Sequence, residues 1–192
     1  MRRFNNKEIN LETKRLTLRV LRLKDVTLHY VNGINDTQVN RYLLMENKGK
    51  QTMESVENYV RFNLNSPSDI LFGIFLKNNN RHIGNVRLSG ISYFHYFSNI
   101  GICIFDKKYW GKNNAKEVLD RVVHFAFNDM GLHYLEAGVF NENKASCKLF
   151  LSSGFKIRSS YGDKLRLKDN FVKVTIFFIT NPNFNYRRLK NI

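Results

Sequence analysis

The sequence predicts a mixed α/β (α+β) fold, in which a largely antiparallel sheet is flanked by helices and holds one parallel pair of strands. Short apolar, β-branched runs alternate along the chain with segments of helical spacing. Residues 71–77 and 82–89 are two such runs, and residues 78–80, all asparagine, form the turn expected between antiparallel strands. Residues 98–105 and 134–140 are separated by a helical segment, which is the usual connection between parallel strands.

In the first half of the chain, alternating side chains and capping residues define the elements. Asp25 is a candidate N-cap for one helix and Thr52 for another, and the second of these helices ends before Ser66-Pro67. The elements predicted before the hairpin are a strand over residues 16–21 and helices over residues 24–32, 37–43 and 52–65.

In the second half, apolar residues recur at helical spacing over residues 115–128. Asn143 is an N-cap candidate for a further helix, and Gly154 suits the left-handed position after it. The remaining elements predicted are strands over residues 98–105, 134–140, 155–159 and 171–180, and helices over residues 115–128 and 143–153. From Asn181 onward the sequence predicts a basic, poorly constrained tail, and residues 1–192 are expected to form a single domain.

The segment between the predicted strand at residues 98–105 and the next helix indicates an anion site. Residues 106–114 are polar and basic, and Lys107, Lys108 and Lys112 contribute positive charge. The first N–H groups of a helix have no partner within it, and they lie at the positive end of the helix dipole. A phosphate or pyrophosphate pocket is therefore expected at this loop.

The formal net charge of the 192-residue chain is +15, from 31 Lys and Arg against 16 Asp and Glu. Such a surface favours anionic partners, among them nucleotide cofactors, nucleotide-linked substrates, nucleic acids and membrane surfaces. The alternative is that a composition rich in lysine and asparagine raises the net charge without any functional role. This alternative stays open because the basic residues are spread along the chain instead of forming one patch.

The cysteines and the apolar runs indicate whether the protein binds a metal, is exported or enters a membrane. Cys103 and Cys147 lack the spacing typical of a zinc site, so no metal is expected. The N-terminal residues contain no apolar core of a signal peptide, and the apolar run at residues 174–179 is too short to span a bilayer. We therefore expect a cytoplasmic protein with no membrane partner.

Five motifs in the same order resemble those of the GNAT superfamily of acetyl-CoA-dependent N-acetyltransferases, and in particular its RimJ/RimL-like branch. They are LETKRLTLR at residues 11–19, IGN at 83–85, IGI at 100–102, YWGK at 109–112, and NKAS at 143–146 followed by Gly154-Phe155. Each motif alone is weak, but the order of the five is specific. The resemblance implies a GNAT-like sheet that is splayed at the strand holding acetyl-CoA.

The resemblance further implies an enzyme that moves an acetyl group from its cosubstrate acetyl-CoA to a primary amine by direct attack on the thioester. The loop backbone would hold the pyrophosphate, and a bulged strand at residues 103–105 would pair with the pantetheine arm. Acyl transfer of this kind needs a neutral amine, an N–H for the developing oxyanion and an acid for the leaving thiolate, but no metal. The cofactor-binding residues implied are Cys103, Ile104, Phe105, Trp110, Gly111, Lys112, Asn113, Asn114, Ala115, Asn143 and Ser146.

The catalytic residues implied are Ser146 and His95. Ser146 is the candidate acid, because many family members have a tyrosine where this chain has Phe150; its alternative role is that of an ordinary first-turn helix residue. His95 precedes the cofactor strand, where a base could face the substrate, and Glu46 lies in the loop that shapes the acceptor pocket. The glutamate that often precedes I-G in this branch is Asn99 here, so no obvious base is present, and a water chain ending at backbone carbonyls is an alternative.

The loop itself departs from the family pattern Q/R-x-x-G-x-G/A. Trp110 stands at its first position, with packing under the loop as its alternative role, and Asn113 stands at its first glycine. Asparagine tolerates a positive φ better than other non-glycine residues, so we expect the loop to form.

Several functions remain open at this point. The acceptor amine could belong to a protein N-terminus or to an amino sugar carried on a nucleotide. One alternative is a basic nucleic-acid-binding module, although no RNP, zinc-finger or helix-turn-helix signature is present and a nucleic-acid partner is not expected. Another is a GNAT fold that binds acyl-CoA but is catalytically weak. The expected partners are acetyl-CoA and a small or peptidic amine, and a homodimer is compatible with the sequence.

Overall fold

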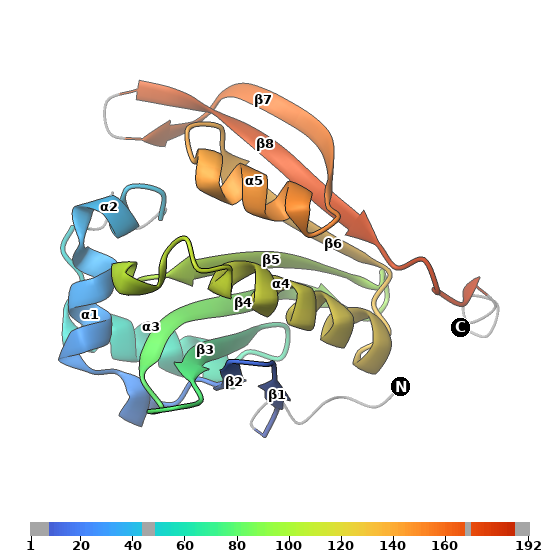
Figure 1. The fold of residues 1–192 in the computed structure, drawn as a ribbon. Helices are drawn as coiled ribbons and strands as arrows, with labels where there is room; N and C mark the ends of the chain where they lie inside the picture. Colours follow the sequence, from blue (N-terminus) through green and yellow to red (C-terminus); the bar gives the residue numbers. More distant parts are fainter. Residues whose placement is uncertain (1–7, 44–48, 168–169, 187–192) are drawn as a thin grey trace.

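The computed structural model describes residues 8–43, 49–167 and 170–186. They form one eight-stranded sheet in the order β1-β2-β3-β4-β5-β6-β8-β7 (Figure 1). Neighbouring strands are antiparallel except β5 and β6, which are parallel. The predicted fold class is confirmed. The strands are β1 (Asn10–Glu12), β2 (Leu16–Val20), β3 (Ile70–Leu76), β4 (His82–Ser92), β5 (Phe97–Ile104), β6 (Tyr134–Phe140), β7 (Lys156–Leu167) and β8 (Asn170–Thr180).

Five α-helices and three short helical segments of other types connect these strands in the described part of the chain. The α-helices are α1 (Leu28–Asn35), α2 (Thr37–Asn40), α3 (Met53–Asn65), α4 (Asn114–His124) and α5 (Lys144–Ser152). The other segments are the 3-10 helices η1 (Leu23–Asp25) and η3 (Lys107–Tyr109) and the π-helix η4 (Phe125–Asp129), which continues α4.

Helices cover both faces of the sheet, and β3 carries apolar side chains on both of these faces. Phe72 packs in the cluster that holds Leu119 of α4 and Phe150 of α5, whereas its neighbour Leu71 packs in the cluster formed by α1, α2 and α3. Successive side chains of a strand point to opposite faces. Helices α4 and α5 therefore lie on one face, and α1 to α3 lie on the other (Figure 1).

The first helix begins later than the sequence predicts. Asp25, the predicted N-cap, accepts two hydrogen bonds from the guanidinium of Arg19, both at 2.7 Å, and one from the Arg22 N–H at 2.8 Å. Burial raises the pKa of the Asp25 carboxyl, but these hydrogen bonds outweigh it and hold the pKa below its ordinary value. Because this carboxylate is engaged elsewhere, Thr27 is the N-cap of α1.

The segment after β8 also differs from the prediction. Asn181 is buried, and its amide donates a hydrogen bond to the carbonyl of Leu132 at 3.1 Å. Phe184 is buried as well. The predicted unconstrained tail is therefore wrong for residues 181–186, while residues 187–192 lie outside the described part.

His82 is a buried histidine whose protonation is linked to folding. Its ring stacks on Phe75 at 4.7 Å and meets the edges of Tyr30 and Phe105. Burial lowers its pKa to about 4, against a partial opposing effect of the hydrogen bond to Asn85. An unfolded histidine has a pKa of about 6.5, so below that pH the unfolded chain binds a proton that the native chain does not bind until about pH 4.

We expect the free energy of unfolding to fall by about 1.4 kcal/mol per pH unit as the pH drops from about 6.5 to about 4, through His82. The measurement is urea unfolding at several pH values. In the variant His82→Gln this slope should disappear, whereas the exposed control His95→Gln should keep it. Equal slopes in His82→Gln and the unmodified chain would contradict the assignment.

Candidate active site

The parallel strands β5 and β6 are paired over three residues only. From Asn99 onward β5 continues to Ile104 along β4, and from Glu136 onward β6 continues to Phe140 along β8. The two halves of the sheet thus separate toward the side where α2 lies, and we call the opening the fork (Figure 1). The splayed sheet implied by the resemblance is present. The three pairs before the fork are Phe97 with Tyr134, Ser98 with Leu135 and Asn99 with Glu136.

The edge of β5 presents backbone groups to the fork. The Phe105 N–H donates to the carbonyl of Ile83 on the β4 side at 3.0 Å. Backbone groups along an antiparallel strand point alternately to its two sides. The N–H and C=O groups of Cys103 and Phe105 therefore face β4, and those of Ile102 and Ile104 face the fork. Of the three residues expected to pair with the pantetheine arm, Ile104 has the required orientation.

The expected bulge lies at the end of the segment 103–105, where it involves Phe105 and the next residue, Asp106. The register of β5 against β4 is continuous from Asn99 to Ile104. The irregularity comes next, where the N–H groups of Phe105 and Asp106 both donate to Ile83 O, at 3.0 and 3.1 Å. Cys103 is half-buried, and burial raises the pKa of its thiol to about 12, so the thiol stays neutral near neutral pH.

Trp110 reaches back to the free edge of β5. Its indole Nε1–H donates to the carbonyl of Ile104 at 2.7 Å, while 42% of the residue remains exposed. The hydrogen bond engages one of the acceptors that face the fork. Trp110 therefore belongs to the wall of the fork, and it is more exposed than a residue packed under the loop.

The loop before α4 is shaped as an anion site requires. Gly111 and Asn113 have positive φ angles of 69° and 59°, which confirms that asparagine can replace the family's glycine here. Asn113 is the N-cap of α4 but makes no side-chain hydrogen bond to it. The N–H groups of the first turn, which includes Asn114 and Ala115, are thus left for another acceptor. A Cβ on Gly111 would meet no atom within 4 Å, so the loop is open.

The lysines of this loop differ in how they are engaged. Lys107 forms an ion pair with Asp36, the N-cap residue of α2, at 2.6 Å. It is therefore neutralised and ties the loop to α2. Lys108 and Lys112 are exposed, and among the described residues neither has an ion-pair partner. These two lysines are available to an anion.

Helix α5 begins beside the other arm of the fork. Asn143 caps it as predicted, with its Oδ1 accepting from the Ser146 N–H at 3.1 Å. Gly154 has the predicted left-handed conformation, with a φ of 84°. Phe150 is buried and stacks on Phe177, so the position of the family's tyrosine holds a core side chain. The Ser146 hydroxyl is half-buried and has no hydrogen-bond partner among the described residues.

The structure separates the two predicted catalytic residues. His95 is exposed in the β4–β5 turn, at the end of β5 where the strands are still paired, and it does not lie at the fork. Glu46 lies outside the described residues. Glu136 was not among the predicted site residues, and the parallel pairing of β5 and β6 places it directly beside Asn99. Aligning the two strands predicted to be parallel could have found it, because Glu136 is the one acidic residue in residues 134–140.

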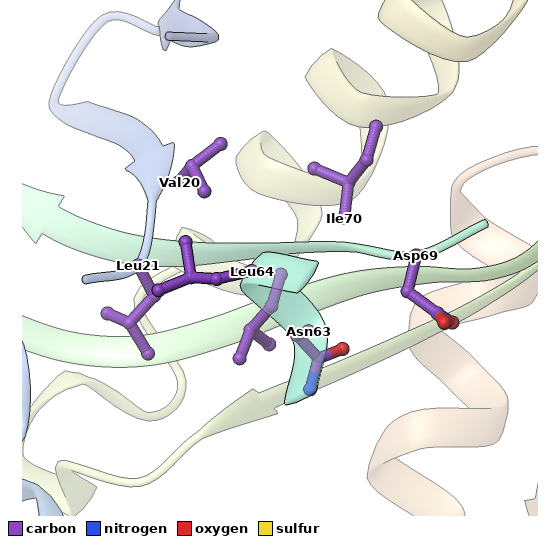
Figure 2. Close-up of a pocket in the computed structure, with 7 residues that line it drawn as sticks. Val20, Leu21, Asn63, Leu64, Asp69 and Ile70 are labelled. Carbon is purple, nitrogen blue, oxygen red and sulfur yellow. The ribbon is translucent and has the colours of Figure 1, made fainter. Parts of the chain in front are cut away.

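Two hollows of the surface lie away from the fork. Figure 2 shows a crevice of about 10 Å³ where the end of α3, with Asn63 and Leu64, meets β2 and β3. It holds at most one water molecule. A wider hollow of about 350 Å³ lies at the β1–β2 edge near Arg22 and Lys24. Neither hollow is lined by the loop or helix residues described above.

Residues 8–43, 49–167 and 170–186 contain neither a metal-binding cluster nor a membrane-spanning helix. In these residues no three His, Cys, Asp or Glu side chains are grouped so as to hold a metal ion. Within the same residues, no helix has the length and apolar character needed to cross a membrane.

A strand edge open at a fork, beside a helix start with free N–H groups, is an arrangement suited to an extended phosphate-bearing ligand. The family model of the GNAT acetyltransferase domain matches residues 15–156. The uncharacterized N-acetyltransferase YoaA from Bacillus subtilis is 31% identical over 148 residues, which cover 76% of this chain and 82% of that protein. The chain belongs to the GNAT acetyltransferase family, and it is an N-acetyltransferase that uses acetyl-CoA.

Solved structures share this fold. RimL, a ribosomal L7/L12 α-N-protein acetyltransferase in complex with coenzyme A, has a TM-score of 0.81 at 15% identity, covering 90% of this chain and 98% of that one. A spermidine N-acetyltransferase from Vibrio cholerae, in complex with CoA and spermine, has a TM-score of 0.79 at 21% identity, covering 88% and 97%. These likenesses confirm the GNAT fold and agree with the RimJ/RimL-like resemblance.

Proposed function

We propose that this enzyme acetylates the primary amine of a nucleotide-linked amino sugar or of a protein N-terminus, by direct attack of the amine on the acetyl-CoA thioester. The observation that carries the proposal is the fork, which exposes the backbone of Ile102 and Ile104 on one arm and leads to the uncapped start of α4. A pantetheine amide can pair with such a strand edge, and a pyrophosphate can bind such a helix start.

Of the predicted cofactor residues, all but Cys103 and Phe105, whose backbone groups face β4, have a role in this proposal. The N–H groups of Gly111 to Ala115 bind the pyrophosphate, and Lys112 adds charge. The edge of β5 at Ile104 binds the pantetheine arm, with Trp110 beside it. Asn143 orients the first turn of α5, so that the Ser146 hydroxyl protonates the leaving thiolate. Acetyl-CoA supplies the activated acetyl group.

The charge of the chain supports an acceptor that is not itself strongly cationic. The net charge of +15 repels a polyamine such as the spermidine named for one structural relative, and it attracts a nucleotide-linked amino sugar. A peptide N-terminus carries one positive charge and is compatible with the site, particularly within an acidic segment. The acceptor assay therefore needs three arms: a nucleotide-linked amino sugar, N-terminal peptides and spermidine.

Acetyl-CoA binding should be visible through Trp110, the single tryptophan of the chain. We expect CoA and acetyl-CoA to change its fluorescence with saturation, because its indole lies at the strand edge that the pantetheine arm would occupy. Acetyl-CoA at 100 times its Kd should stabilise the fold by about 2.7 kcal/mol. Thermal unfolding with and without acetyl-CoA measures this effect.

The control for that experiment is Trp110→Phe, which removes the fluorescence signal and should retain a thermal shift. If saturating acetyl-CoA does not change the temperature of thermal unfolding, the assignment of the fork as the cofactor site is wrong. If acetyl-CoA binds but no free CoA thiol is released with any of the three acceptor classes, the alternative of a catalytically weak GNAT fold is favoured. Phe150 and Asn99 support that alternative.

A further inference from the structure

Asp106 is a buried carboxylate at the point where β5 ends and the loop before α4 begins. Its side chain is only 6% exposed. It lies next to a loop that has to attract an anion, where a negative charge by itself is unfavourable. We propose that Asp106 is a positioning residue, which holds this loop in the shape that binds the pyrophosphate of acetyl-CoA before the cofactor arrives. This inference rests on the pyrophosphate role proposed above for the loop.

The carboxylate of Asp106 joins three parts of the chain. Its Oδ1 accepts a hydrogen bond from the Lys108 N–H at 3.2 Å, which makes Asp106 the N-cap of η3. Its Oδ2 accepts from Arg81 Nε at 2.8 Å and lies 3.4 Å from Nε2 of His29 in α1. Arg81 belongs to the segment between β3 and β4. The start of the loop is thus fixed to α1 and to the connection that precedes β4.

The far end of the loop is held by a second buried polar side chain, that of Asn114. This residue is the first of α4 and is 4% exposed. Its Nδ2 donates to the carbonyl of Tyr109, the last residue of η3, at 3.0 Å. The short helix η3 is therefore fixed by Asp106 at its start and by Asn114 at its end. The left-handed residues Gly111 and Asn113 lie between η3 and α4.

The residue after Asp106 attaches the loop to α2 as well. Lys107 Nζ lies 2.6 Å from Asp36 Oδ2 and 3.4 Å from Gln38 Oε1. Side chains of α1, α2 and α4 and of the β3–β4 connection therefore all hold the segment that begins with Asp106. A binding site that is already ordered loses less conformational entropy when its ligand binds. These attachments thus favour pyrophosphate binding, although Asp106 and Asp36 are themselves anions.

The negative charge of Asp106 makes the sign of its effect informative. A carboxylate repels a pyrophosphate, so if Asp106 acted through its charge alone, its removal would tighten the binding of CoA. If Asp106 acts by positioning, its removal leaves the Lys108 N–H without its cap and releases the loop from Arg81 and His29. The loop must then be ordered during binding, which weakens the affinity for CoA. Charge and positioning therefore predict opposite changes of the Kd.

The test measures the Kd of CoA for Asp106→Ala and for the unmodified protein by isothermal titration calorimetry. We expect Asp106→Ala to raise this Kd by about tenfold or more. Pantetheine, which lacks the pyrophosphate and nucleotide parts of CoA, should bind both proteins with the same Kd. The matched control is Asp120→Ala, which removes a carboxylate that is also paired with a cation, Lys116 at 2.7 Å, but lies on α4 outside the loop. Its Kd for CoA should not rise.

A second variant decides the matter if Asp106→Ala does not fold. Asn114→Ala releases the other end of η3 without any change of charge, and we expect it to raise the Kd of CoA about threefold or more. An unchanged or lower Kd of CoA in the variant that folds would overturn the proposal. An equal rise of the Kd for pantetheine would also overturn it, because the damage would then not be confined to the loop. An unmodified protein that does not bind CoA would instead overturn the proposed function itself.

Discussion

Gly84→Ala should weaken both the fold and acetyl-CoA binding. A Cβ at this position would lie 2.5 Å from the carbonyl oxygen of Cys103 and 3.0 Å from the Cα of Ile104. Both contacts are with the backbone of β5, which cannot swing away as a flexible side chain can. The added methyl group must push β5 outward at the residues that form the arm of the fork.

We expect Gly84→Ala to lower the free energy of unfolding by about 2–3 kcal/mol, as overpacking of a dense core does. The Kd for acetyl-CoA should rise about tenfold, because the displaced edge no longer matches the pantetheine arm, and tenfold corresponds to about 1.4 kcal/mol. Urea unfolding measures the first effect, and titration of the Trp110 fluorescence measures the second.

Gly162→Ala is the matched control for this prediction. Gly162 lies in β7, and a Cβ there would meet no atom within 4 Å. Both the stability and the Kd should therefore stay close to those of the unmodified chain. Loss of stability in Gly84→Ala without any change of Kd would show that the β5 edge does not contact the cofactor.

Local signals in the sequence were sufficient for most elements of the fold. The strand at residues 134–140 was predicted with the observed bounds, since its apolar alternation and its flanking turns are both local. The N-caps Thr52 and Asn143 were predicted for the same reason, because a cap acts within three residues of itself. The positive φ of Asn113 was expected because asparagine stands there at a glycine position of the family's loop pattern, and asparagine tolerates such a φ.

Predictions failed where distant residues decide the outcome. Asp25 does not cap a helix because Arg19, from β2, holds its carboxylate. Asn181 is not part of a free tail because it bonds to the carbonyl of Leu132, 49 residues away in sequence. The place of Glu136 beside Asn99 became apparent only from the register of two strands. Each of these contacts depends on the tertiary fold, which no local window of sequence contains.

Ser146→Ala should slow turnover strongly while leaving the cofactor bound. Helix α5 is capped through the Ser146 backbone N–H, which alanine retains, so the first turn should keep its shape. The change removes only the hydroxyl, which has no hydrogen-bond partner among the described residues and is therefore free to act on a ligand. Because Phe150 is buried in the core and carries no proton donor, it cannot replace the hydroxyl as an acid.

We expect kcat of Ser146→Ala to fall by about 10²-fold to 10³-fold, the range typical of a lost general acid, with little change in the Kd for acetyl-CoA. Ser146→Thr, which keeps a hydroxyl at the same carbon, should restore most of the rate, and Ser152→Ala at the far end of α5 should change neither quantity. Steady-state release of CoA thiol together with thermal shifts separates kcat from binding. An unchanged kcat in Ser146→Ala would remove this residue as the acid and leave protonation of the thiolate to water, since the fork offers no other hydroxyl on the first turn of α5.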